Sequence, residues 1–401
     1  MKVIQKINER IHYIGASDLK ISLFENLFPL SSGVSYNAYL IVDEKTAVLD
    51  TVDQSVGDVF FEKLAVSLGE KPLDYLVIHH LEPDHSAMIL ELIRRYPSVT
   101  LVVNAQSQKM LKQFTDGELN CKMQVVQEGD VLNLGYHRLT FLMAPMVHWP
   151  EVMVSYDQTD RILFSADAFG TFGALCGNLF SDQLTLDESF YAEARRYYTN
   201  IVGKFGTSVQ ALLNKAKTLS IDMICPLHGP IWRNQWETFF HKYELWSTYE
   251  AESSDIVLIY ASIYQHTYQA VCDLAALLAM RGVCNIKMYD VSKTDVSYLI
   301  AEIFRVKNIV LATPTYNGGL FPKMANLLED MKALNVQNKT VAVIENGTWA
   351  PVASKKINDQ LKEMKNMTVL NPQIKIRTVL KTEDKTQLEE LADLLWQAYQ
   401  K

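Results

Sequence analysis

The stretch "LDYLVIHHLEPDH", residues 73–85, is an apolar run whose last seven residues carry three histidines, Glu82 and Asp84. Residues 73–78 have the composition of a buried strand. Where a strand ends and unwinds, alternate side chains can turn toward one point, and Pro83 predicts a loop because it interrupts regular hydrogen bonding. Burying such a cluster without partners would be costly. The stretch therefore predicts a polar site at the end of a buried strand.

The segments around this stretch predict strands covered by helices. We expect strands at 36–42, 45–52, 99–105, 137–145, 152–158, 161–168 and 221–229, and helices at 56–68, 86–97, 187–205 and 208–219. The first two strands are separated by "DE", a break typical of a hairpin. Mostly antiparallel strands with covering helices predict an αβ sandwich over residues 1–250.

The pattern changes near Ser254. Short apolar strands at 255–262, 285–291, 308–315, 340–347 and 374–380 alternate with helical segments. Such alternation predicts a doubly wound parallel sheet. We therefore expect a second domain at 254–401, after a final helix and a short linker within 234–255.

Length and charge limit the possible functions. A chain of 401 residues is too long for one ordinary core, so two domains are expected. The hydrophobic content of 48% is typical of globular proteins. A formal net charge of −8 argues against nucleic-acid binding and against a polybasic membrane-surface protein.

The cysteine content and the hydropathy of the sequence indicate in which cellular compartment the protein is expected. The five cysteines include no C-x-x-C pair, so neither a disulfide framework nor a cysteine-bound metal is indicated. The N-terminal residues lack the apolar core of a signal peptide, and no run of about 18 apolar residues predicts a membrane span. We expect a cytoplasmic protein.

Seven residues at strand ends form a candidate metal site. They comprise four imidazoles and three carboxylates: His80, Glu82, Asp84, His85, His148, Asp167 and His228. Three carboxylates would offset part of the charge of two divalent ions, and one carboxylate would be shared between the two ions. Nitrogen and oxygen ligands without thiolate suit iron or manganese, while zinc stays open.

A structural role is the alternative for each of these residues taken alone, because a single His or Asp at a strand end is more often a cap or a solvated group. We interpret the other histidines as structural residues and not as metal ligands: His12, His79, His137, His241 and His266. His79 is expected to point to the opposite strand face from His80.

The ordered set H-x-E-x-D-H, followed by His, Asp and His at later strand ends, resembles the metallo-β-lactamase superfamily. Its hydrolases carry H-x-H-x-D-H, whereas this chain has Glu82 at the second position. A carboxylate there is similar to the flavodiiron proteins (A-type flavoproteins), which bind two non-haem irons. Segments 36–43, 146–150, 167–170, 193–198 and 228–232 also match. The resemblance implies a metallo-β-lactamase-like αβ/βα sandwich followed by a flavodoxin-like domain.

The resemblance also implies ligand roles. One iron would be held by His80, Glu82 and His148, and the other by Asp84, His85 and His228, with Asp167 as the bridge. One tyrosine of the pair Tyr197 and Tyr198 would hydrogen-bond the bound substrate.

Three strand-end loops of the second domain form a candidate flavin site. Parallel sheets bind ligands at the carboxyl ends of their strands, and hydroxyls at a helix N-terminus suit a phosphate. The P-loop lysine is absent, which disfavours ATP or GTP. FMN is expected to contact Ser262, Ile263, Tyr264, Gln265, His266, Thr267, Pro314, Thr315, Tyr316, Asn317, Gly318, Gly319, Asn346, Gly347, Thr348 and Trp349.

The function implied by the resemblance is electron transfer from a carrier through FMN to a diiron pair that reduces O₂ to water, or NO to N₂O. Because no C-x-x-C pair is present, no fused rubredoxin is expected. The donor would be a separate rubredoxin-like protein or a reduced deazaflavin. A head-to-tail homodimer, or a dimer of dimers, is expected.

Two other functions remain open. The first is a dinuclear metal hydrolase with an accessory flavodoxin-like domain, against which Glu82 argues. A colourless protein loaded with zinc would favour it. The second is a binding or electron-carrier module whose metal site is inactive, which unaltered turnover after Glu82→Ala would support.

Overall fold

The computed structural model describes residues 3–114 and 119–401, and it divides into two compact units. The first unit comprises the chain up to Tyr198 together with Thr207–Glu244. The second comprises Thr199–Gly206 together with Leu245–Lys401. The division falls within helix α7 (Trp236–Ser247), which belongs to the segment expected to hold the last helix and the linker.

The first unit contains two large sheets, and the first of them is mixed. Its strand order is β1-β2-β7-β8-β9-β10-β11, and β1, β2, β7 and β8 pair in antiparallel fashion. From β8 to β11 the pairing is parallel. The sequence predicted mostly antiparallel strands and did not indicate which strands pair in parallel. The bounds are β1 Gln5–Lys6, β2 Ile11–Tyr13, β7 Tyr39–Val42, β8 Thr46–Leu49, β9 Tyr75–Val77, β10 Thr100–Asn104 and β11 Lys122–Val126.

The second sheet is antiparallel except for one pair, β15 with β16. Its order, β12 to β17, follows the chain. The bounds are β12 Val131–Asn133, β13 Arg138–Met143, β14 Met153–Asp157, β15 Ile162–Phe164, β16 Met223–Cys225 and β17 Trp232–Arg233. Two short pairs, β3 (Ala16–Asp18) with β6 (Val34–Tyr36) and β4 (Leu23–Phe24) with β5 (Phe28–Pro29), complete the strands of the first unit.

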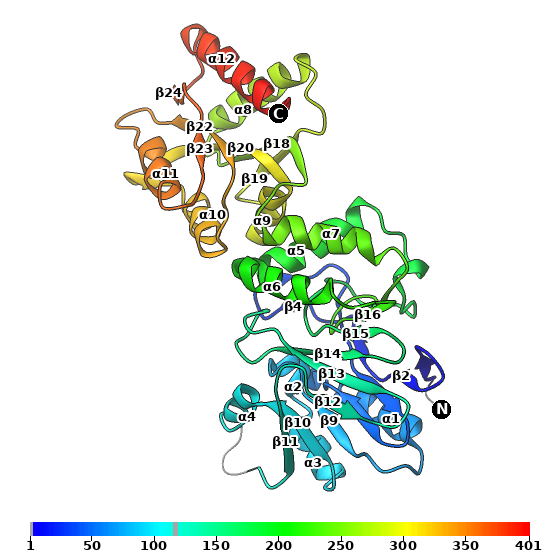
Figure 1. Ribbon diagram of the computed structural model, residues 1–401. Helices are drawn as coiled ribbons and strands as arrows, with labels where there is room; N and C mark the ends of the chain where they lie inside the picture. Colours follow the sequence, from blue (N-terminus) through cyan, green and yellow to red (C-terminus); the bar gives the residue numbers. More distant parts are fainter. Residues whose placement is uncertain (1–2, 115–118) are drawn as a thin grey trace. The chain divides into compact units, whose positions relative to one another are not determined.

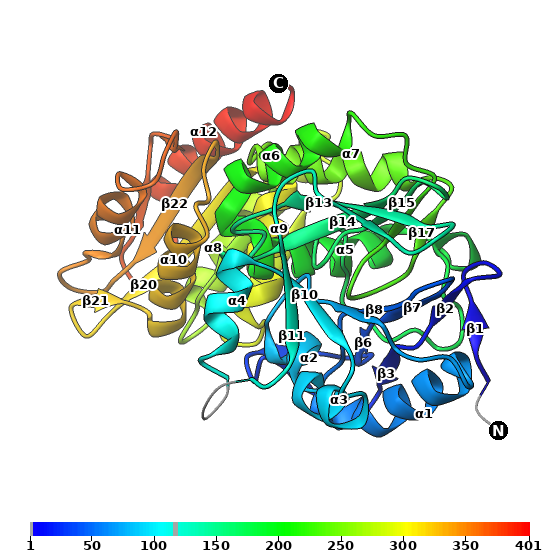
Figure 2. The same ribbon diagram turned by 60° about the horizontal axis from the view of Figure 1, so that its bottom comes forward.

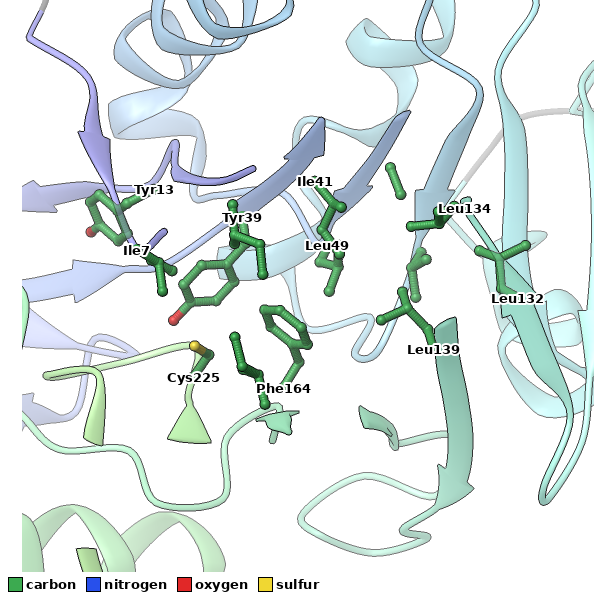
Figure 3. Packing of buried hydrophobic residues seen from close by; sticks show 14 of the residues in the cluster. Ile7, Tyr13, Tyr39, Ile41, Leu49, Leu132, Leu134, Leu139, Phe164 and Cys225 are labelled. Atoms are coloured by element: carbon green, nitrogen blue, oxygen red, sulfur yellow. The ribbon is translucent and has the colours of Figure 1, made fainter. Parts of the chain in front are cut away.

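The core of the first unit lies between its two sheets. Figure 3 shows Tyr39 and Leu49 from the first sheet facing Phe164 and Leu139 from the second. The rings of Tyr39 and Phe164 lie 5.4 Å apart, and all four side chains are buried. Alternate residues of each strand face this core, which is why the strands are apolar on one side.

Helices cover the outer faces of both sheets (Figures 1 and 2). Helices α1 (Gly57–Leu68) and α3 (Ile89–Arg95) lie along the first sheet, and α5 (Glu188–Tyr197), α6 (Gly206–Ala216) and α7 lie along the second. Helix α1 buries Phe60, Leu64 and Leu68 at helical spacing. A shorter helix, α4 (Ala105–Leu111), follows β10 and is capped by Asn104.

The loop predicted around Pro83 is in part a helix. Pro83–Ser86 form the one-turn helix α2, so Asp84 and His85 lie on helical backbone. Proline is compatible with the first helical position, where no intrahelical N–H bond is needed. The prediction of an irregular loop was therefore wrong here, although the strand does end at Val77.

The second unit is a parallel sheet with all five predicted strands. Its order is β19-β18-β20-β22-β23, and β24 also pairs with β22. The bounds are β18 Ser253–Tyr260, β19 Lys287–Asp290, β20 Val306–Tyr316, β22 Thr340–Asn346, β23 Thr368–Val369 and β24 Ile374–Ile376. The short β21 (Gly319–Leu320) turns back on β20.

Helices cover both faces of this sheet. Helices α8 (His266–Met280) and α12 (Thr382–Tyr399) pack together on one face, and α9 (Val296–Arg305) and α10 (Pro322–Ala333) on the other (Figure 1). Helix α11 (Ala353–Leu361) contacts β22. Among residues 3–114 and 119–401, no helix combines the length and the apolar character that crossing a membrane requires.

Candidate functional site

The first cluster of predicted ligands gathers four donor atoms. His80 Nε2 lies 3.3 Å from Glu82 Oε2 and 3.2 Å from Asp167 Oδ2. His148 Nε2 lies 3.0 Å from the same Glu82 oxygen and 3.3 Å from the same Asp167 oxygen. His80 leaves the end of β9, His148 follows β13 and Asp167 follows β15. Residues distant in sequence therefore meet at one edge of the sandwich.

The second cluster contains Asp84, His85 and His228. His228 Nε2 is 3.0 Å from His85 Nε2 and 3.1 Å from Asp84 Oδ2. Asp167 reaches this group with its other oxygen, since Oδ1 lies 3.2 Å from His85 Nε2. One carboxylate therefore divides its two oxygens between the two clusters, as a bridging ligand does.

Hydrogen bonds behind the clusters orient the imidazoles. His80 Nδ1 donates to Glu151 at 2.8 Å, and the same carboxylate accepts the N–H of Leu81. His228 Nδ1 donates to the carbonyl of Ser35 at 2.7 Å. These bonds place the lone pair of each ring on Nε2, toward the cluster, and such partners are typical of metal-binding histidines. Neither Glu151 nor Ser35 was among the predicted site residues.

The electrostatics around Asp167 favour positive charge beside this carboxylate. Burial opposes protonation of His148, but hydrogen bonds to Asp167 and Glu82 raise its pKa to about 9. Burial alone would raise the pKa of Asp167, yet the charges of His80 and His85 hold it well below its usual range. A bound cation would replace these protons, because metal and proton compete for the same nitrogen atoms.

The donor set fits two metal ions. Both oxygens of Asp84 and one of Asp167 are buried without a hydrogen-bond partner, an arrangement that is costly unless a cation is nearby. The two Nε2 atoms of His85 and His228 face one another at 3.0 Å, which suits two ligands of one ion. Donors about 2.1 Å from a metal lie about 3.0 to 3.4 Å apart, and most of the separations above fall in that range.

A cavity of about 350 Å³ opens at the carboxyl end of the parallel sheet in the second unit. All three predicted flavin loops contribute to it, and only Gln265, Tyr316 and Gly319 of the predicted residues do not line it. Ala350 and Thr378, which were not among the predicted residues, also line the cavity. The lining residues are Ser262, Ile263, Tyr264, His266, Thr267, Pro314, Thr315, Asn317, Gly318, Asn346, Gly347, Thr348, Trp349, Ala350 and Thr378.

The cavity has features that suit a flavin mononucleotide. Helix α8 begins at His266, so its first N–H groups lie beside the hydroxyls of Ser262 and Thr267, and Ser262 Oγ accepts the N–H of Tyr268 at 3.3 Å, an arrangement suited to phosphate. Tyr264 and Trp349 are 82% and 80% exposed although both line the cavity. Large exposed aromatics beside a cavity are typical of surfaces that a planar ligand covers.

Comparisons with known proteins agree with both sites. A family model described as "ODP family beta lactamase" matches residues 34–229. The anaerobic nitric oxide reductase flavorubredoxin of Vibrio vulnificus is 30% identical over 378 residues, which cover 92% of this chain and 75% of the relative. The chain belongs to the flavodiiron proteins.

Solved structures of flavodiiron proteins share the fold. The rubredoxin oxygen:oxidoreductase of Desulfovibrio gigas superposes with a TM-score of 0.92 at 28% identity and covers 99% of each chain. The flavodiiron protein of Giardia intestinalis gives a TM-score of 0.91 at 22% identity, covering 100% of this chain and 97% of that one. The predicted fold class, a metallo-β-lactamase-like sandwich followed by a flavodoxin-like domain, is confirmed.

The two candidate tyrosines of this flavodiiron protein lie differently. The ring of Tyr197 is 5.6 Å from that of His228, and its buried hydroxyl has no hydrogen-bond partner. The ring also packs on Gly170, where a Cβ would approach it to 2.8 Å. Tyr198 instead packs on Tyr243. Burial and the charge of Asp167 hold the pKa of Tyr197 well above its usual value, so its hydroxyl keeps its proton.

Glu25 is a further carboxyl at the metal clusters, which the sequence analysis missed. It lies in the three-residue turn between β4 and β5, where Glu25 and Asn26 both have positive φ. Although Glu25 is exposed at the surface of the chain, desolvation beside the cluster and the neighbouring Glu82 raise its pKa to about 8. No motif marks this position, because the hairpin reaches the site only through the tertiary fold.

Two histidines interpreted as structural have structural partners. His79 bonds Asp50 through Nδ1 at 2.5 Å and Ser155 through Nε2 at 2.8 Å. His137 bonds Asp157 at 2.8 Å, and Asp160 lies nearby. The oxygens of Asp157 already accept the N–H groups of Arg138, Thr159 and Asp160, so this carboxylate has hydrogen-bond partners without a metal.

Proposed function

We propose that this flavodiiron protein reduces O₂ to water, NO to N₂O and water, or both, using electrons that pass from a separate donor through FMN to two irons held by the metal clusters. The main support for this proposal is the position of Asp167, whose two oxygens face different clusters. The relatives named nitric oxide reductase flavorubredoxin and rubredoxin oxygen:oxidoreductase support the substrate class. They also support a rubredoxin-like donor; a reduced deazaflavin is the alternative.

The residues of each cluster have distinct roles in this proposal. His80, Glu82 and His148 would hold one iron, and Asp84, His85 and His228 the other. Glu151 and the Ser35 carbonyl keep the imidazoles of His80 and His228 turned toward the irons. When bound, FMN would collect electrons from the donor and the iron pair would deliver them to the substrate.

Reduction of either substrate consumes protons, four for each O₂ and two for each pair of NO molecules that yields N₂O. Tyr197 keeps a protonated hydroxyl within the site and can donate a hydrogen bond to bound substrate. Aromatic rings surround His228: Phe24 at 5.4 Å, Tyr36 at 5.8 Å and Tyr197 at 5.6 Å. Such rings exclude water from one side of the second cluster.

The test is reduction of the iron-loaded protein without oxygen, followed by parallel measurement of O₂ and NO consumption. We expect a yellow protein with about two irons and one FMN per chain that consumes at least one of the two gases. Reduced rubredoxin and a reduced deazaflavin, supplied separately, distinguish the donors. A colourless protein that binds zinc and consumes neither gas would contradict the proposal and favour the hydrolase.

A further inference from the structure

The segment after β24 forms an unusual turn at the flavin cavity. The N–H of Val379 donates to the carbonyl of Arg377 at 3.0 Å, and Thr378 between them has φ of 70°. A hydrogen bond across three residues with positive φ at the centre is the rare, strained form of the γ-turn. A β-branched residue seldom adopts positive φ. Such strain persists only where other contacts hold it, often beside a ligand.

Hydrogen bonds join this turn to the third flavin loop. The side-chain amide of Asn346 donates to the carbonyl of Thr378 at 3.0 Å and accepts its N–H at 3.1 Å. The N–H of Gly347 donates to the carbonyl of Ile376 at 3.0 Å. The hydroxyls of Thr378 and Thr348 lie 2.9 Å apart and are hydrogen-bonded. The amide of Asn346 therefore ties the third flavin loop to the turn.

The position of the turn indicates which part of a flavin it would face. Thr378 lines the same cavity as Thr348 and Trp349. In the sheet, β24 is three strands from β18, or about 14 Å. The phosphate-binding hydroxyls follow β18, so the turn lies at the opposite side of the cavity, where the ring system of FMN would extend.

We propose that Arg377–Val379 form a fourth flavin-binding loop, in which Thr378 positions the Asn346–Trp349 loop against the isoalloxazine ring. This inference rests on the proposed flavin site. Thr378 acts through the hydroxyl of Thr348 and is thus a positioning residue. The hydroxyl of Thr378, rather than the bulk of its side chain, positions the Asn346–Trp349 loop.

The test compares Thr378→Val, which keeps the β-branched shape, with Thr378→Ser, which keeps the hydroxyl. The full-length protein is stripped of flavin and titrated with FMN, and quenching of FMN fluorescence gives the dissociation constant. We expect Thr378→Val to raise this constant about 3- to 10-fold, the effect of one lost hydrogen bond. Thr378→Ser should bind FMN as the wild type does. Thr382→Val, an exposed threonine of the same domain outside the cavity, is the matched control.

A double-variant cycle with Thr348→Val tests the coupling. Because the two hydroxyls bond each other, Thr348→Val with Thr378→Val should be little worse than either change alone. Unchanged affinity in Thr378→Val, equal impairment in Thr378→Ser, or fully additive effects would each overturn the fourth loop. A wild-type protein that binds no FMN at all would instead overturn the proposed flavin site, and this loop with it.

Discussion

At the residue scale, Asp167 links the two metal clusters. Its Oδ2 faces His80 and His148, and its Oδ1 faces His85. In the proposed site both oxygens would bind metal, so an amide, which offers one weaker oxygen acceptor and an NH₂ donor group, would not replace the carboxylate. The residue also supplies negative charge that two divalent cations require.

Asp167→Asn is therefore expected to lower iron content from about two per chain to one or fewer. Metal analysis after dialysis measures this. Asp157→Asn is the control, because Asp157 is also buried and paired with a histidine but lies outside both clusters. Full retention of two irons by Asp167→Asn would refute the bridging role.

Tyr197 and Tyr198 are adjacent tyrosines with different surroundings, and this gives a second prediction. Tyr197→Phe should slow turnover about tenfold or more while leaving iron content unchanged, because it removes a hydrogen-bond donor at the substrate. Tyr198→Phe should leave turnover close to the wild-type rate, since that ring packs on Tyr243. Steady-state consumption of O₂ or NO distinguishes the two variants. Equal effects would refute the assignment of Tyr197.

At the element scale, the loop that carries His228 is fixed by a side chain from another sheet. The amide of Asn37, just before β7, donates to the carbonyls of Pro226 and Gly229, each at 2.9 Å, and its oxygen accepts the hydroxyl of Tyr13. All these bonds are buried. The loop after β16 therefore depends on Asn37 for its conformation.

Asn37→Ala should destabilise the protein by about 2 to 3 kcal/mol, because it leaves buried carbonyls unpaired, and should weaken retention of one iron. Urea unfolding and iron analysis after dialysis measure the two effects. Asn308→Ala, at a buried asparagine of the other unit, should lower stability but retain both irons. Wild-type iron content in Asn37→Ala would show that the loop is held by other contacts.

Lys339 connects α9 with the sheet of the second unit. Its Nζ donates to the carbonyls of Phe304 and Val306 at 3.2 and 2.8 Å, and burial lowers its pKa to about 7 despite the opposing charges of Glu250 and Glu252. The unfolded lysine titrates near 10.5. Between these pH values the unfolded chain binds more protons, so this residue makes stability rise with pH.

We predict that the melting temperature of the wild type, measured relative to Lys339→Met, increases between pH 7 and pH 10. A change of about 2 °C or more is expected from the size of the unit. Lys355→Met, at an exposed lysine of the same unit, should show no such trend. A difference between wild type and Lys339→Met that stays constant with pH would contradict the prediction.

At the scale of the whole molecule, the proposed function would require electrons to pass from FMN to the irons, and therefore the two cofactors to be close. We expect a head-to-tail homodimer, or a dimer of dimers, in which the flavin of one subunit serves the irons of another. Sedimentation equilibrium should give a mass of twice or four times the chain mass of 45.6 kDa. A strictly monomeric protein with full activity would refute this.

Much of the fold and the candidate site could be predicted from the sequence, because the signals are local. Alternation of apolar strands with helical segments predicted the parallel sheet, and polar residues at strand ends predicted ligand candidates that the structure brings into two clusters. The prediction was less accurate where pairing depends on distant strands: the parallel half of the first sheet was not specified, and β11 and β12 were missed. The helix at Pro83 was missed because proline both ends strands and begins helices.

The sequence alone determined which residue types are present, their order and the family they indicate. Only the tertiary structure decided how they are used: Asp167 faces two clusters, Tyr197 rather than Tyr198 faces His228, and Thr378 joins the flavin cavity. The physical reason is distance along the chain. Composition and periodicity act over a few residues, whereas these contacts join residues tens of positions apart, such as His80 and Asp167, and exist only after the sheets have formed.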